Sequence, residues 1–255
     1  MGDTQKPPLI EVHFIQEWGD MMRSKDETNF KEACKNNSDH YCVSVVPIFN
    51  HLDKPQMDEI MQSVHAVTFK RGEIIYRAGD KAEWLYITHI GKIKIYRLSD
   101  EGKEQLVRIL HPGDFTGELA IFKDTVHEAY AEAMSLAKVC MISRKAMQNL
   151  LLKYPSISLK ILEEFANRLE QSEMQTTRFA TKSVDTRLGL FLVENMDERN
   201  QQVVLPMNYK DLASYLGTTP ETISRVLKEL ERKGYIKKKS QKRIDILDAD
   251  ALLLM

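Results

Sequence analysis

The stretch Asn208 to Arg232, NYKDLASYLGTTPETISRVLKELER, has the pattern of two helices joined by a tight turn. Apolar residues recur in DLASYL and again between Ile223 and Leu230 at three- and four-residue steps, which is the spacing of one helix face. Gly217 supplies the left-handed residue on which helices commonly end, and the threonine pair before Pro220 can cap the second helix. The stretch therefore predicts a helix-turn-helix.

The outer face of the second helix carries Glu221, Arg225, Lys228 and Arg232. A helix with an apolar back and a polar front, preceded by a shorter helix, is the arrangement that inserts into the DNA major groove. Arg225 can bind the O6 and N7 atoms of a guanine, and Glu221, one turn earlier, can accept a hydrogen bond from the paired cytosine. For two amphipathic helices alone, an ordinary hairpin with a solvated charged face is the competing interpretation.

The residues that follow favour DNA binding. After Gly234 comes YIKKKSQKRIDILD, two short alternating runs around a basic turn, which resembles the wing of a winged helix. From Arg225 to Arg243 there are nine Lys or Arg against two Glu, whereas the whole chain has a formal net charge of -1. Positive charge concentrated in one segment of a nearly neutral protein indicates a phosphate-binding surface.

The segment DLASYLGTTPETISRVLKELERKGYI resembles the DNA-binding helix-turn-helix of the Crp/Fnr superfamily of bacterial transcription regulators. The run ETISR (221–225) matches the recognition-helix signature of that family, in a form similar to the Fnr branch, whose half-sites resemble TTGAT. The resemblance covers about residues 42 to 255, and it implies double-stranded DNA and RNA polymerase as partners. The candidate DNA-contacting residues are Glu221, Ser224 and Arg225, which the resemblance places at the bases, with Thr219, Thr222 and Lys228 beside them.

The length and composition of the chain limit the classes of protein to which it can belong. A chain of 255 residues, 43% hydrophobic and 29% charged, is long enough for one large or two modest domains. It has no run of eighteen apolar residues and no basic-then-apolar leader, so we expect neither membrane insertion nor secretion. Three cysteines argue against a disulfide scaffold and for a reducing compartment, which we expect to be the cytoplasm.

The segment between His65 and Ser143 consists of short apolar or alternating runs separated by glycine turns, namely AVTF, EIIY, WLYITHI, KIKIYRL, LVRIL and AKVCMI. Strands at this spacing predict a compact β-sandwich or barrel. Their order resembles the double-stranded β-helix, or β-roll, of cyclic-nucleotide-binding domains. Short helices are expected between residues 42 and 64, ahead of these strands.

Lys145 to Thr181 has a helical pattern throughout, with Pro155 near a helix start and an apolar stripe of Leu162, Phe165, Ala166, Leu169 and Phe179. Such a stripe on a long helix predicts pairing with a second copy of the chain, although packing within one subunit stays open. The predicted fold is α+β, with an N-terminal extension (1–41), a β-roll sensor domain (42–150), a dimerisation helix (151–182) and a winged helix-turn-helix domain (183–255).

Gly117-Glu118-Leu119 marks the candidate effector pocket of the β-roll. In the cyclic-nucleotide-binding members that this chain resembles, an Arg followed by Ser or Thr about ten residues after Gly-Glu-Leu holds the cyclic phosphate. Here those positions are Glu128 and Ala129. Because a carboxylate repels a phosphate and the bidentate Arg contact is missing, we expect no cyclic AMP binding.

The three cysteines Cys34, Cys42 and Cys140 are the other sensor candidates. The position of Cys140 is similar to that of the internal cluster-ligating cysteine of Fnr. A four-iron cluster normally takes four thiolates, so three cysteines leave one iron without a ligand unless His40 or an external group serves. The run around Cys42, HYCVSVVPIF, is similar to the Fnr-like proteins of lactic-acid bacteria (the Flp type), and this resemblance implies a reversible Cys42–Cys140 disulfide. Alternatively, Cys140 is only a small packed hydrophobe.

The sequence has no nucleophile–base pair, metal-ligand spacing or phosphate-cradling loop, so we expect neither an enzyme nor a metal site. The prediction is a homodimeric transcription regulator that binds a palindrome and responds to redox state or oxygen through Cys42 and Cys140. Two alternatives remain, namely a Crp/Fnr regulator controlled by an unknown small-molecule effector and a ligand-binding module whose C-terminal helices bind protein. Steep weakening by salt is expected only for DNA binding.

Overall fold

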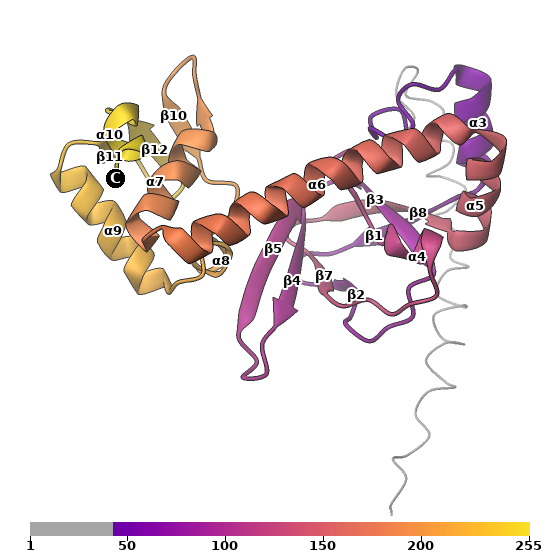
Figure 1. Cartoon of the computed structure of the whole chain (residues 1–255), viewed down its shortest axis with the longest axis horizontal. Coiled ribbons are helices and arrows are strands. Elements are labelled where there is room, and N and C mark those ends of the chain that lie inside the picture. The colour runs from indigo at the N-terminus through magenta and orange to yellow at the C-terminus, as the bar shows by residue number, and fades with distance from the viewer. Residues whose placement is uncertain (1–42) are drawn as a thin grey trace, which may run out of the picture.

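The computed structural model describes residues 43–255. The N-terminal extension (1–41), which contains Cys34, and the adjoining Cys42 lie outside the described residues. The described chain forms a β-rich domain and a smaller C-terminal domain, joined by the long helix α6 (Pro155–Thr181), which spans the molecule (Figure 1). The predicted α+β class, with a β-roll, a long helix and a winged helix-turn-helix, is confirmed.

Two antiparallel four-stranded sheets form the β-roll. The first has the order β1-β8-β3-β6 and contains β1 (Val64–Phe69), β3 (Trp84–Ile90), β6 (Phe115–Thr116) and β8 (Ala137–Ser143). The second has the order β2-β7-β4-β5 and contains β2 (Ile74–Tyr76), β4 (Ile93–Leu98), β5 (Glu104–Leu110) and β7 (Tyr130–Ala133). Strand β5 is therefore an edge strand.

Both faces of the first sheet are buried. Along β8, Val139 and Met141 join the core between the two sheets, whereas Cys140 and Ile142 join a second core beneath the helices. This alternation follows from the two-residue period of a strand. The helices over the second core include α3 (Lys54–Gln62) and α5 (Arg144–Lys153).

Two expectations about the helices need correction. Residues 43–52 form hydrogen-bonded turns rather than a helix, and a helix, α3, begins only after Asp53, whose carboxylate caps it. The segment expected to be helical from Lys145 to Thr181 is interrupted at Tyr154, which has φ -125° and ψ 77°. The interruption has a local cause, because the residue before Pro155 is disfavoured in the helical conformation.

The C-terminal domain has the elements of a winged helix. Its helices are α7 (Val184–Glu194), α8 (Tyr209–Tyr215), α9 (Pro220–Arg232) and α10 (Ala249–Leu253). Its sheet has the order β11-β12-β10-β9 and contains β9 (Met196–Asp197), β10 (Gln202–Val204), β11 (Ile236–Lys238) and β12 (Arg243–Ile246). Within residues 43–255, none of the helices has the length and apolar character needed to cross a bilayer.

Candidate nucleic-acid interface and sensor cavity

A side-chain hydrogen bond caps the N-terminus of each of the helices α8 and α9. The Asn208 amide oxygen accepts from the backbone N–H of Asp211 at 2.9 Å, and the Thr219 hydroxyl accepts from that of Thr222 at 3.3 Å. The Thr219 and Thr222 hydroxyls also lie 3.2 Å apart. These two candidate DNA-contacting threonines are thus engaged in holding the start of α9.

Gly217 makes the corner between the two helices. Its φ of +65° lies in the left-handed region, and the N–H of Thr218 closes the end of α8 on the carbonyl of Ala213 at 2.9 Å. A Cβ added to Gly217 would lie 2.9 Å from the ring of Phe179, near the end of α6. The corner therefore needs glycine both for its backbone conformation and for its packing against α6.

The two faces of α9 differ as the sequence predicts. Ile223, Val226, Leu227 and Leu230 are buried in the core of the C-terminal domain. Glu221, Arg225 and Lys228 are exposed, Ser224 is half-buried, and these four line a shallow open groove with Pro220. Bonds from its own backbone N–H and from the Thr219 hydroxyl lower the pKa of Glu221, so that its carboxylate is an acceptor at neutral pH.

A basic hairpin flanks this helix. Strands β11 and β12 pair with Ile236 opposite Ile246, and the turn between them exposes Lys239, Lys242 and Arg243. The Glu231 carboxylate, near the end of α9, accepts from the backbone N–H of Lys238 at 2.8 Å. This bond fixes the hairpin to α9, so that the positive charges of both elements belong to one rigid unit.

A cavity of about 1200 Å³ is lined by the β-roll, by α6 and by the C-terminal domain, which contributes residues such as Phe191 and Leu216. All three candidate pocket residues, Gly117, Glu118 and Leu119, line it. Gly117 has φ +81°, and a Cβ at this position would lie 2.3 Å from the carbonyl oxygen of Trp84. Only glycine can therefore bring the chain through this point to Glu118, which precedes the short helix α4 (Leu119–Phe122).

Two arginines that sequence reasoning did not assign to the cavity converge on Glu118. Arg168 of α6 donates to its Oε1 atom at 2.5 Å, and Arg108 of β5 lies 3.5 Å from the same atom. Arg168 also donates to the carbonyl of Phe115 at 3.0 Å. The sequence shows Arg168 only as a charged border of the apolar stripe, so no local signal places it here.

The remaining polar groups of the cavity are tightly packed. The ring of His127 stacks on that of Tyr76 with centroids 3.8 Å apart, and the Tyr76 hydroxyl lies 2.9 Å from that of Thr116. Burial raises the pKa of Tyr76 to about 12 and lowers the pKa of His127, so both groups are neutral at pH 7. Within residues 43–255, His127 Nε2 and Glu118 Oε2 are buried without a hydrogen-bond partner.

The positions that the resemblance assigns to a phosphate carry a carboxylate and a methyl group. Glu128 and Ala129 both line the cavity, and Glu128 forms an exposed ion pair with Arg97 at 2.7 Å. This arrangement presents a carboxylate where a cyclic nucleotide needs a cation. Of the arginines that line the cavity, Arg108 and Arg168 are already paired with Glu118.

Cys140 is completely buried in the core beneath the helices. It lies in β8 opposite Ala66 of β1 and Ile87 of β3, and the same core contains Val43, the residue that follows Cys42 in the chain. In the part of the chain that the structure describes, no cluster of three or more His, Cys, Asp or Glu has metal-site geometry. The other two candidate ligands, Cys34 and Cys42, lie outside the described residues, so the cluster alternative stays a prediction.

Comparisons with known proteins agree with both domains. Residues 66–154 match the model of the cyclic nucleotide-binding domain, and residues 186–255 match that of the Crp-like helix-turn-helix domain. The chain is 38% identical over 216 residues to the "Probable transcriptional regulator flp" of Lacticaseibacillus casei, covering 83% of this chain and 96% of the relative. It is 28% identical over 210 residues to the fumarate and nitrate reduction regulatory protein of Vibrio cholerae, covering 80% and 82%.

Among solved structures, FixK2 from Bradyrhizobium japonicum is similar, with a TM-score of 0.65 and 26% identity over 74% of this chain and 95% of that one. These relatives are regulators rather than enzymes, as the sequence predicts for this chain. On the evidence of its two domains and of a relative that it matches over almost the whole length, the chain belongs to the Crp/Fnr family of transcription regulators.

Proposed function

We propose that the protein works as a cytoplasmic homodimer that binds a near-palindromic DNA site and contacts RNA polymerase there. The observation that carries the DNA-reading part is the row of exposed Glu221, Arg225 and Lys228, with half-buried Ser224 among them, on a helix whose opposite face is buried. Arg225 pairs with a guanine and Glu221 with the cytosine opposite, whereas Lys228 and the wing lysines bind phosphates. Thr219 and Thr222 approach the DNA backbone while capping α9.

Dimerisation is supported by apolar side chains that α6 leaves exposed. Leu159, Leu162 and Leu169 are 70%, 61% and 61% exposed, and their spacing of three and seven residues places them on one helix face. Leu159 was not among the residues predicted for this stripe. Burying these side chains against a second α6 removes them from water and sets two recognition helices side by side, as a palindromic half-site pair requires.

A gel-shift titration on a TTGAT-type palindrome tests the DNA-binding proposal. We expect the affinity to fall steeply as salt rises, because lysines and arginines displace counterions from phosphates. An affinity that is insensitive to salt, or equal on scrambled DNA, would instead support the alternative in which the C-terminal helices bind protein. Running each titration with and without reductant shows whether thiol state matters.

The signal that we propose is redox state, read by Cys42 and Cys140. The proposal is supported by the family relationship and by Val43, which lies in the same core as Cys140. Since Cys140 has no exposed surface, a peroxide must first oxidise the Cys42 thiolate to a sulfenic acid. Attack by the Cys140 sulfur then forms the disulfide and releases water. Oxidation would thereby strain the core under the first sheet.

Mass spectrometry without reductant checks this proposal. After brief peroxide treatment, we expect a peptide that links Cys42 to Cys140 and a loss of both free thiols. The Cys140→Ser variant should stop at oxidised Cys42, and the Cys34→Ser variant should behave like the wild type. Linkage through Cys34, or no linkage at all, contradicts the proposal, and an iron assay on anaerobically purified protein tests the cluster alternative.

Cyclic AMP is not expected to bind. Isothermal titration with up to millimolar cyclic AMP should give no saturable heat, because Glu128 repels the phosphate and Ala129 offers it no hydroxyl. The protein is titrated in the presence of reductant, because the reductant keeps the cysteines as free thiols and excludes an effect of disulfide formation on binding. Saturable binding in the micromolar range would overturn this prediction.

A small-molecule effector is the second candidate signal. It is favoured by the cavity, in which His127 Nε2 and Glu118 Oε2 lack hydrogen-bond partners within residues 43–255. Buried polar atoms without partners are costly, and a ligand that donates to them would recover that free energy. Thermal shift measurements with small polar compounds, compared between the wild type and Glu118→Gln, test this candidate.

A further inference from the structure

The core of the C-terminal domain contains side chains from the β-roll. Leu106 of β5 is only 2% exposed and belongs to the same cluster as Leu212 and Ile223, and Ile109 and Met134 pack against that cluster. An apolar contact of this kind opposes the relative motion that is the usual expectation for two domains joined by a short linker. The helix-turn-helix therefore packs against the sensor domain as well as against α6.

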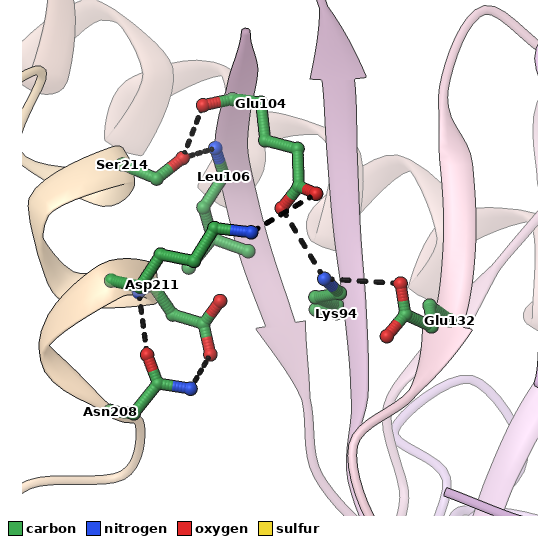
Figure 2. Close-up of polar contacts among 8 residues, drawn as sticks. Lys94, Glu104, Leu106, Glu132, Asn208, Asp211 and Ser214 are labelled. Atoms are coloured by element: carbon green, nitrogen blue, oxygen red, sulfur yellow. Dashed lines mark hydrogen bonds and ion pairs between the residues drawn. The ribbon is translucent and has the colours of Figure 1, made fainter. Parts of the chain in front are cut away.

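A serine hydroxyl completes this contact. Ser214 of α8 donates to the carbonyl of Glu104 at 2.7 Å and accepts from the N–H of Leu106 at 2.6 Å (Figure 2). The Gln105 side chain donates to the carbonyl of Ser214 at 2.6 Å. An edge strand exposes such unpaired N–H and C=O groups, and one hydroxyl satisfies two of them here.

Charged side chains surround the serine. Lys94, which is 8% exposed, lies between two carboxylates, 3.4 Å from Glu104 and 3.1 Å from Glu132 (Figure 2). The other oxygen of Glu104 lies 3.5 Å from Lys210 of α8. Glu104 thus connects the buried lysine of the sheet to the first helix of the helix-turn-helix.

A β-bulge allows β5 to contact both the C-terminal domain and the cavity. The register with β4 pairs Ile95 with Arg108 but Tyr96 with Leu106, so Val107 is the extra residue. In a regular strand, residues three apart point to opposite faces. The bulge places Leu106 and Ile109 together against the C-terminal domain, while Arg108 between them reaches Glu118 in the cavity.

We propose that this β5–α8 contact, made by Leu106, Glu104 and Ser214, holds the helix-turn-helix in its DNA-binding orientation and ties that orientation to the sensor cavity. None of the groove residues Glu221, Ser224, Arg225 and Lys228 takes part in it, so the contact leaves the proposed recognition face open. If a domain must first reorient before it can bind DNA, its apparent affinity for DNA is reduced. A domain that is already held in the DNA-binding orientation avoids that reduction. The inference rests on the proposed DNA-binding function.

Full-length Ser214→Ala tests the contact with two measurements. Its affinity for the TTGAT-type palindrome is expected to fall by roughly threefold to thirtyfold, and the Leu106 amide should exchange its hydrogen faster. Ser214→Thr, which keeps the hydroxyl, should restore both values. Glu104→Gln is expected to weaken DNA binding in the same direction, whereas Glu101→Gln, an exposed acid in the turn of the same hairpin, should not.

Each contrary result is decisive. Unchanged exchange at Leu106 means that the contact is not made in solution. Faster exchange with unchanged or tighter DNA binding means that the contact does not position the domain for DNA. If the wild type fails to bind the palindrome, the proposed function is wrong, whereas the exchange measurement still reports whether the β5–α8 contact exists.

Discussion

Arg225→Ala is expected to lower the affinity for the TTGAT-type palindrome by about 1 to 3 kcal/mol per half-site, or roughly 5- to 150-fold. The side chain is exposed, whereas Val226 and Leu227 beside it hold α9 in the core. The loss should therefore appear in DNA binding and leave the thermal unfolding temperature unchanged. Gel shifts at fixed salt on specific and scrambled duplexes measure the effect.

The choice of duplex identifies the role of Arg225. A base-reading arginine gives a loss that is confined to the specific site and largest when its guanine is present, because the bidentate contact is lost only there. Arg199→Ala, which removes an exposed arginine from the turn between β9 and β10, is the matched control and should bind as the wild type does. An equal loss on scrambled DNA would show that Arg225 binds only phosphate.

Leu162→Glu is expected to have the larger effect. A carboxylate at the centre of the α6 stripe would be desolvated and would face its own copy, so the dimer should dissociate into monomers. Affinity for the palindrome then falls by at least about a hundredfold, because the second half-site is no longer held nearby. Sedimentation velocity and gel shifts on the same samples measure both effects.

The control for this substitution is Leu152→Glu. Leu152 is 83% exposed on α5, outside the predicted stripe, and replacing it should change neither assembly nor DNA binding. Since Leu162 is itself 61% exposed, its substitution should not unfold the monomer, which circular dichroism can verify. A Leu162→Glu protein that remains dimeric would show that α6 does not form the interface.

The recognition helix could be predicted from sequence because all its determinants are local. The Thr219 cap, the Gly217 corner and the apolar spacing from Ile223 to Leu230 lie within one stretch, and each has a specific backbone or packing requirement. The six predicted strands also appear, because each is apolar and bounded by turns. The family resemblance indicated which residues are candidates for contacting the bases, whereas the local sequence pattern already predicted the geometry of the two helices.

The sensor cavity could not be predicted to the same extent. Strand β7, with the sequence YAEA, contains alanine and glutamate, which have little strand preference, and its pairing with β2 and β4 makes it a strand. The convergence of Arg168 and Arg108 on Glu118 joins residues 50 and 10 positions away from it. The contact of Leu106 with the C-terminal domain is likewise non-local, since an alternating strand pattern does not say what covers its outer side.

The bulge at Val107 has a consequence for building regulators with new inputs. Because the extra residue lets Leu106 and Ile109 face the C-terminal domain together while Arg108 faces the cavity, substitutions on the cavity side of β5 leave the surface that contacts α8 in place. A library that varies Arg108 and its neighbours in the cavity would therefore sample new inducers while the β5–α8 contact that links the cavity to the C-terminal domain is kept. A regular strand of the same length, without the bulge, would turn Ile109 to the face opposite Leu106, so part of the contact with the C-terminal domain would be lost.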